Sequence, residues 1–200
     1  MKNRDYTLII DASTSMSTQD QAGGKNRWEI LQESTLALAT TCEKFDDDGL
    51  TVYIFSSEFK RYDNVKSIQV PEIFNENQPG GTSQMAVVLQ DAFNNYFQRK
   101  SVGKTKQEGE TLLVLTDGLP SDRMAVTDVI LRATRRMENA EELGISFIQV
   151  GSDPKVTQFL KSLDDQLQGI GASYDICDTL TLDEMENMTI TEVLQKAIFD

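Results

Sequence analysis

The stretch Tyr6-Thr-Leu-Ile-Ile-Asp-Ala-Ser-Thr-Ser15 joins a short apolar run directly to an acid and two serine hydroxyls. An apolar run of this length is typical of a strand buried on both faces. The polar residues after it predict a loop at the carboxyl end of that strand. Similar runs occur at 50–55, 111–115 and 145–150, and a weaker run at 173–177 predicts an edge strand.

The segments between these runs carry apolar residues at steps of three or four, which is the period of a helix. Asn26 and Glu29 resemble a capping box, so a helix is expected to begin there, with Trp28 on its core-facing side. Further helices are expected at about 83–98, 123–143, 154–163 and 189–198. Because strands that alternate with helices need crossover connections, the sequence predicts an α/β fold. We expect one domain over residues 1–200, a doubly wound, mostly parallel sheet with helices on both faces.

Composition excludes several classes of function. A net charge of -13 argues against binding to nucleic acid or to an anionic membrane surface. The chain has no His, which excludes Ser-His-Asp catalysis and a His-based zinc site. No apolar run is long enough for a signal-peptide core or a membrane span. Cys42 and Cys177 are interpreted as thiols of a reducing compartment, so a cytoplasmic location is expected.

Three groups of polar residues are expected to meet at one edge of the sheet, because ligands of open α/β sheets bind beyond the carboxyl ends of the strands. The groups are Asp11-Ala-Ser13-Thr-Ser15, Gly80-Gly81-Thr82 and Thr116-Asp117-Gly118. Mg²⁺ takes about six oxygen ligands and usually keeps some waters. The sequence therefore predicts a site for Mg²⁺, with Mn²⁺ and Ca²⁺ as alternatives. Its ligands would be Asp11, Ser13, Ser15, Thr82 and Asp117.

Together these three motifs resemble the metal-ion-dependent adhesion site (MIDAS) of von Willebrand factor type A (VWA) domains, of the intracellular type. Their order matches, and so does the strand–helix layout over nearly the whole chain. The resemblance implies a Rossmann-like fold in which Ser13, Ser15 and Thr82 bind the ion directly. Asp11 and Asp117 would act through water. It also implies a protein-binding module whose ion holds an Asp or Glu of a partner protein, within a larger assembly.

Three loops beside the motifs are expected to contact the partner, because specificity usually resides in loops on a rigid scaffold. They span residues 17–25, 75–81 and 118–123. Three basic residues near these loops would attract an acidic partner across an otherwise negative surface, namely Lys25, Arg27 and Arg123.

Two other functions remain open on the sequence. A Mg²⁺-dependent phosphoryl-transfer enzyme would use Asp11 as an aspartyl nucleophile. The haloacid-dehalogenase type needs a second carboxylate two residues later, where this chain has Ser13. A P-loop nucleotidase is disfavoured as well, because Gly23-Gly24-Lys25 lacks the rest of that motif. For both reasons no catalytic residue is assigned and no enzyme is expected. The other alternative is a structural or scaffold domain whose ion is incidental.

Overall fold

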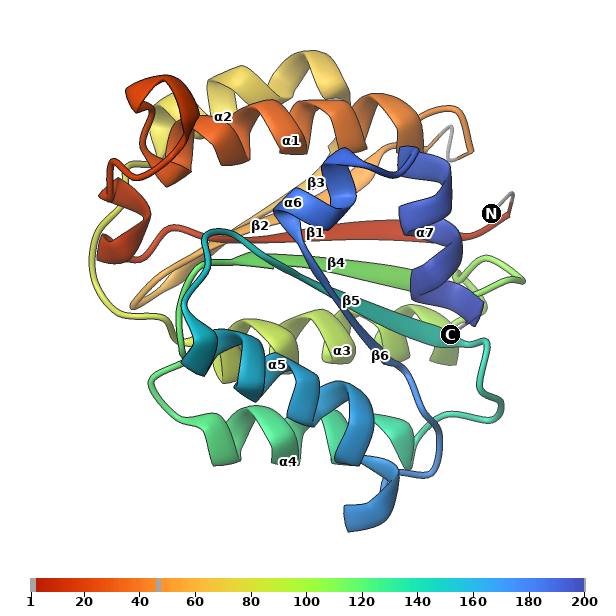
Figure 1. Cartoon of the computed structure of the whole chain (residues 1–200). Coiled ribbons are helices and arrows are strands. Elements are labelled where there is room, and N and C mark those ends of the chain that lie inside the picture. Colours follow the sequence, from red (N-terminus) through yellow and green to blue (C-terminus); the bar gives the residue numbers. More distant parts are fainter. Residues whose placement is uncertain (1–2, 46–47, 200) are drawn as a thin grey trace.

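A single six-stranded sheet forms the centre of the computed structural model, which describes residues 3–45 and 48–199. The strand order is β3-β2-β1-β4-β5-β6 (Figure 1). Five strands are parallel: β1 (Asp5–Asp11), β2 (Leu50–Phe55), β4 (Glu110–Thr116), β5 (Leu143–Gln149) and β6 (Cys177–Thr181). At one edge, β3 (Phe59–Val65) pairs with β2 in the antiparallel sense. The predicted α/β class and mostly parallel sheet are confirmed.

Helices cover both faces of the sheet (Figure 1). One face is covered by α1 (Arg27–Cys42), α2 (Val70–Glu76), α6 (Leu182–Glu186) and α7 (Ile190–Phe199). The other is covered by α3 (Met85–Ser101), α4 (Arg123–Thr134) and α5 (Pro154–Gln166). Because successive strand side chains point to opposite faces, Ile9 of β1 belongs to one core and Leu8 and Ile10 to the other. Both faces of β1 are therefore buried, with Thr7 as the one buried polar residue before Asp11.

Local signals explain where several helices begin. Asn26 and Glu29 form the predicted capping box at the start of α1. Trp28 is buried in the core, as predicted, and its ring centroid lies 4.4 Å from that of Phe74. The side chain of Asp122 accepts a hydrogen bond from the backbone of Ala125 and so caps α4.

Two predicted elements differ most from their observed boundaries, and the others agree to within about three residues. The helix expected at 123–143 ends at Thr134, and the following turns bring the chain back to the sheet, where β5 begins at Leu143. The apolar period nevertheless continues to Met137, which lies after the end of the helix and is also buried. The edge strand covers 177–181 instead of 173–177, because Cys177 is the residue that pairs with Ile145 of β5.

Three elements were not predicted at all: β3, α2 and α6, the last of which is only 5 residues long. β3 has the sequence Phe-Lys-Arg-Tyr-Asp-Asn-Val, and most of its side chains are exposed or half-buried because the strand lies at the sheet edge. The helix α2 begins beside Pro71 and is only 7 residues long, too short to show a clear apolar period. A polar edge strand and a short helix both lack the pattern by which the other elements were found.

Among residues 3–45 and 48–199, no helix has the length and apolar character needed to cross a membrane. Cys42 and Cys177 are both buried and form no disulfide. The cytoplasmic location stays a prediction. Residues 1–2, 46–47 and 200 of the predicted single domain lie outside the described part of the chain, and its extent over 1–200 also stays a prediction.

Candidate metal centre

The five predicted ligands lie at the carboxyl edge of the sheet, around the two central strands β1 and β4. Asp11 is the last residue of β1, and Ser15 lies in the short 3₁₀ turn Thr14–Ser17 that follows. Asp117 comes directly after β4, which pairs with β1. This edge is on the left of the view in Figure 1. The strand order therefore brings together motifs that are about a hundred residues apart in the chain.

Asp11 is fully buried, and both of its carboxylate oxygens accept hydrogen bonds. Oδ1 accepts from the backbone N–H of Ser13 at 2.8 Å. Oδ2 accepts from the hydroxyls of Ser83 at 3.0 Å and Thr116 at 2.7 Å. Burial raises the pKa of Asp11, while the hydrogen bonds from Ser13 and Thr116 oppose that shift. Asp11 thus ties the ends of β1 and β4 to the segment that precedes α3.

Ser13, Ser15 and Asp117 form a chain of hydrogen bonds beside Asp11. The hydroxyl oxygens of Ser13 and Ser15 lie 3.2 Å apart. Ser15 Oγ donates to Asp117 Oδ1 at 2.7 Å. Ser13 and Asp117 are buried, whereas Ser15 is exposed. Four of the five predicted ligands therefore belong to one hydrogen-bonded group, which reaches the surface at Ser15.

Thr82 reaches the same edge but does not join this group. The backbone N–H of Thr14 donates to the carbonyl of Gly81 at 3.1 Å, which places the Thr82 segment against the loop after β1. The Thr82 hydroxyl lies 3.3 Å from that of Ser57, and the Thr82 N–H donates to the same Ser57 oxygen at 3.1 Å. In this structure the Thr82 hydroxyl is thus oriented by Ser57.

Four residues that shape the site were missed or misjudged from the sequence. Ser83 and Thr116 bind the Asp11 carboxylate, and Ser57 contacts Thr82. Thr116 belongs to the third motif, Ser83 follows Thr82, and Ser57 lies two residues after β2. Those positions were the available signal. Arg27 was considered only as a charge that attracts a partner, whereas its Nη1 donates to Asp117 Oδ2 at 2.8 Å.

The donor set fits a hard divalent cation. It offers three hydroxyl oxygens and two carboxylates, and no nitrogen or sulfur ligand. In the part of the chain that the structure describes, no three His, Cys, Asp or Glu side chains are grouped as a metal site. An ion at this edge would therefore depend on the hydroxyls and on water to complete its coordination.

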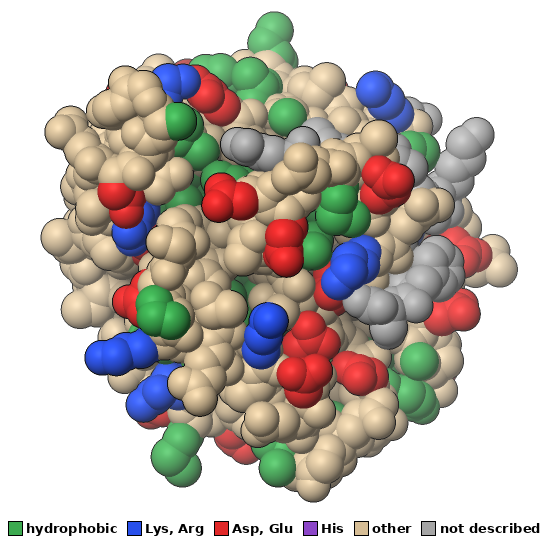
Figure 2. Space-filling view, viewed as in Figure 1, with side chains coloured by type: hydrophobic (Ala, Val, Ile, Leu, Met, Phe, Trp, Pro, Cys, Tyr) green, Lys and Arg blue, Asp and Glu red, His purple; other side chains and the backbone are tan. Residues whose placement is uncertain are grey.

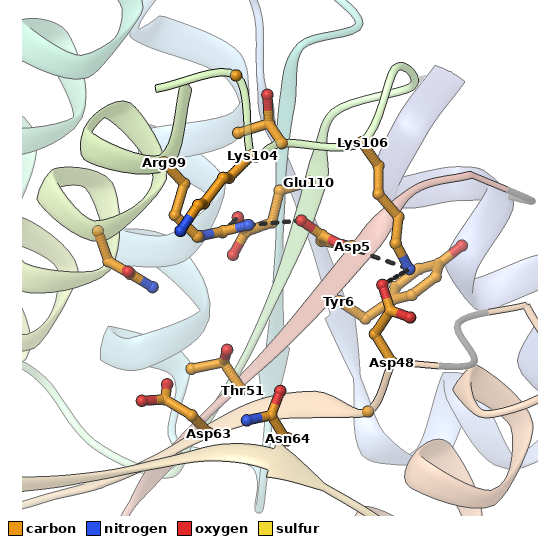
Figure 3. A pocket seen from close by; sticks show the side chains of 14 residues that line it. Asp5, Tyr6, Asp48, Thr51, Asp63, Asn64, Arg99, Lys104, Lys106 and Glu110 are labelled. Carbon is orange, nitrogen blue, oxygen red and sulfur yellow. Dashed lines mark hydrogen bonds and ion pairs between the residues drawn. The ribbon is translucent and has the colours of Figure 1, made fainter. Parts of the chain in front are cut away.

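A second polar feature lies at the opposite edge of the sheet, where β1 and β4 begin (Figure 3). Asp5 accepts a hydrogen bond from Arg99 at 2.6 Å and lies 3.5 Å from the ammonium group of Lys106. Arg99 also binds the buried carboxylate of Glu110. These ion pairs join the starts of the two strands to α3, and they are remote from the metal motifs.

Comparison with known proteins bears on the fold and the family. Residues 4–198 match the vWA-TerF-like family, described as the vWA found in the TerF C terminus. No curated protein matches the chain.

Three solved structures resemble the chain in fold. A variant of the PilB minor pilin from Streptococcus sanguinis has a TM-score of 0.69 at 12% identity, over 98% of this chain and 61% of the pilin. The manganese-loaded TRAP protein of Plasmodium vivax has a TM-score of 0.61 at 16% identity, over 92% of this chain and 71% of TRAP. The pilus adhesin SpaC of Lactobacillus rhamnosus GG has a TM-score of 0.63 at 14% identity, over 99% of this chain and 30% of the adhesin. The chain thus spans less than two thirds of the pilin and of the adhesin.

Proposed function

Because this chain belongs to the TerF-like von Willebrand factor type A family, we propose that it is a divalent-metal-dependent protein-binding module. The ion would be held in a MIDAS by Asp11, Ser13, Ser15, Thr82 and Asp117. A partner protein would supply an Asp or Glu carboxylate to an open coordination position. The observation that carries this proposal is the hydrogen-bonded group of Asp11, Ser13, Ser15 and Asp117 at the carboxyl edge of the sheet.

The chemistry of the donors favours an external carboxylate. Hydroxyl ligands carry no charge, so an ion held mainly by them stays strongly electrophilic and attracts an anionic oxygen. We favour Mg²⁺, with Mn²⁺ and Ca²⁺ as alternatives. The presence of manganese in the TRAP structure supports a divalent ion in a domain of this fold.

Basic residues near this edge would attract an acidic protein partner locally. The net charge of -13 disfavours nucleic acid and anionic membranes as partners. On the left of Figure 2, the side where the carboxyl ends of the strands lie in Figure 1, Lys and Arg side chains lie among Asp and Glu side chains. Arg123, at the start of α4, is exposed and near Asp117 in the chain, so it remains our candidate for contact with the partner. We place this interaction in the cytoplasm, within a larger assembly.

We do not propose an enzyme. A phosphoryl-transfer mechanism would need Asp11 as an accessible nucleophile. Asp11 has no exposed surface, and each of its oxygens already accepts hydrogen bonds from neighbouring residues.

The decisive experiment is a thermal melt of the purified chain with EDTA, Mg²⁺ or Mn²⁺. An ion present at 100 times its dissociation constant should add about 2.7 kcal/mol to the free energy of unfolding. Thr82→Ala should lose most of this gain, because the variant lacks one proposed ligand. Thr40→Ala, on the exposed side of α1, removes the same hydroxyl away from the site and should keep the gain. A melt that neither metal changes would contradict the proposal.

Once metal binding is established, a pull-down from cell extract tests the role of the ion in partner binding. Proteins retained with Mg²⁺ should be released by EDTA and should not be retained by Thr82→Ala. Retention that is indifferent to EDTA would favour a scaffold domain with an incidental ion.

A further inference from the structure

Arg27 holds a fixed cation against the metal motifs. It is the first residue of α1, and its backbone N–H donates to the carbonyl of Thr18 at 3.1 Å. Its Nη1 donates to Asp117 Oδ2 at 2.8 Å, and its Nε lies 3.1 Å from both carboxylate oxygens of Asp20. The Arg27 side chain is only 15% exposed. The hydrogen bonds with Asp20 and Asp117 raise the pKa of Arg27, which therefore stays charged at every usable pH.

The backbone of a neighbouring loop leaves room for this guanidinium. Gly151 follows β5 and has a φ of +76°, a backbone conformation that residues other than glycine rarely adopt. A Cβ atom at this position would lie 3.1 Å from the Arg27 Cζ. The guanidinium thus lies between the loop after β5, the loop that carries Asp20 and the carboxylate after β4, three segments that the fold brings together.

Asp117 has both carboxylate oxygens occupied, one by Ser15 and the other by Arg27. Its side chain has no exposed surface, so solvent screens the contact with Arg27 only weakly. The side chain of Asp20, the other partner of Arg27, is 38% exposed and accepts from Nε and Nη2, whereas Asp117 accepts from Nη1. The charge of Asp20 is therefore more strongly screened at the metal site than the charge of Arg27.

This arrangement changes the charge balance of a loaded site. Two ionised carboxylates, Asp11 and Asp117, would neutralise a divalent cation by themselves. With Arg27 counted, the sum is +1, and the carboxylate of Asp20 would bring the whole group to zero. Because the Asp20 side chain is 38% exposed and that of Arg27 only 15%, the positive charge of Arg27 is the less screened of the two beside a loaded site. A nearby cation opposes the entry of another cation and attracts an anion, and both effects are larger where water is excluded.

We propose that Arg27 sets the charge of this metal site, so that it weakens divalent-ion binding by the domain alone and keeps the loaded site attractive to a carboxylate. This inference rests on the proposed function. Ion and partner then strengthen each other's binding, because a coupling between two ligands is reciprocal. Arg27 acts through Asp117 as a positioning residue and does not bind the partner itself.

The test measures the Mn²⁺ dissociation constant of the full chain by calorimetry, for the wild type and three variants. Arg27→Met removes the cation, Arg27→Lys keeps it, and Lys25→Met is the matched control. Lys25 is two residues away and pairs with Glu33, not with Asp117. We expect Mn²⁺ binding to tighten at least tenfold in Arg27→Met. It should change less than threefold in Arg27→Lys and less than twofold in Lys25→Met.

A melt without metal separates this role from a purely structural one. Arg27→Met leaves the buried carboxylate of Asp117 without its cation, so the metal-free protein should melt at a lower temperature although it binds Mn²⁺ more tightly. A purely structural role would lower both stability and affinity. Arg27→Gln is a second neutral variant that retains a side-chain N–H donor, and it should bind Mn²⁺ more tightly as well if Arg27→Met fails to fold.

The outcomes distinguish this inference from the proposed function. If the wild type binds Mn²⁺ and the neutral variants bind it equally or more weakly, only the role of Arg27 is rejected. Equal tightening by Lys25→Met would reject it too, because general charge would then explain the effect. If neither the wild type nor any Arg27 variant binds Mn²⁺, the metal-dependent function itself fails.

Discussion

Gly81→Ala tests the geometry that carries Thr82 to the edge of the sheet. Gly81 has a φ of +79°, in the left-handed region, and an added Cβ would lie 2.5 Å from the Ser57 hydroxyl oxygen. That oxygen accepts from the Thr82 N–H and contacts the Thr82 hydroxyl. The new methyl group therefore forces Ser57 to rotate and to give up its contacts with Thr82.

The expected cost has two parts. A residue with a Cβ in the left-handed conformation costs roughly 1–2 kcal/mol. Loss of the hydrogen bond between Ser57 and Thr82 adds about 1 kcal/mol. For a chain of 200 residues, each kcal/mol lowers the melting temperature by about 2–4 °C. We therefore expect Gly81→Ala to melt roughly 5–10 °C below the wild type.

The neighbouring Gly80 provides a matched control in the same loop. Its φ is not in the left-handed region, and an added Cβ would meet nothing within 4 Å. Gly80→Ala should leave the melting temperature unchanged or raise it slightly, because alanine restricts the unfolded chain. Adding Gly81→Ala to Ser57→Ala should cost less than adding it to the wild type, since the clashing oxygen is gone. Equal melting temperatures for Gly80→Ala and Gly81→Ala would refute the reasoning.

Three further predictions concern residues outside the metal motifs. Burial and repulsion by Asp178 raise the pKa of Asp164 to about 6. The folded protein therefore holds this proton more tightly than the unfolded chain, and it loses stability as the pH rises from 3.8 to about 6. Asp164→Asn should stabilise the protein by roughly 1 kcal/mol at pH 7 and have little effect near pH 4; equal effects in melts at both pH values would contradict this. Arg99→Met should lower the free energy of unfolding in urea by about 3 kcal/mol, because it leaves Glu110, whose side chain is 2% exposed, without the Arg99 cation. A smaller loss when Glu110→Gln is also present would support that cause. Asp122→Ala should cost about 1 kcal/mol through loss of the α4 cap, and an unchanged melting temperature would show that the cap contributes nothing.

Much of the fold could be read from local patterns. The strands β1, β2, β4 and β5 are mostly apolar and are buried on both faces. The capping box at Asn26 depends on residues that are close in the chain. The ends of other elements could not be read in this way. The helix α4 ends at Thr134 although the apolar period continues, and β6 begins at Cys177 because that residue pairs with β5. These boundaries depend on the path of the chain back to the sheet.

By itself, the sequence determined the alternation of strands and helices and the oxygen donors that follow β1, precede α3 and follow β4. Both depend on residues adjacent in the chain, and parallel strands bring their carboxyl ends to a common edge. Only the tertiary structure decided that Ser57 orients Thr82 and that Arg27 pairs with Asp117. Arg27 and Asp117 are 90 residues apart, so their contact depends on how α1 packs beside the end of β4. A hydrogen bond needs its atoms within about 3 Å, which only the packed fold provides at such separations.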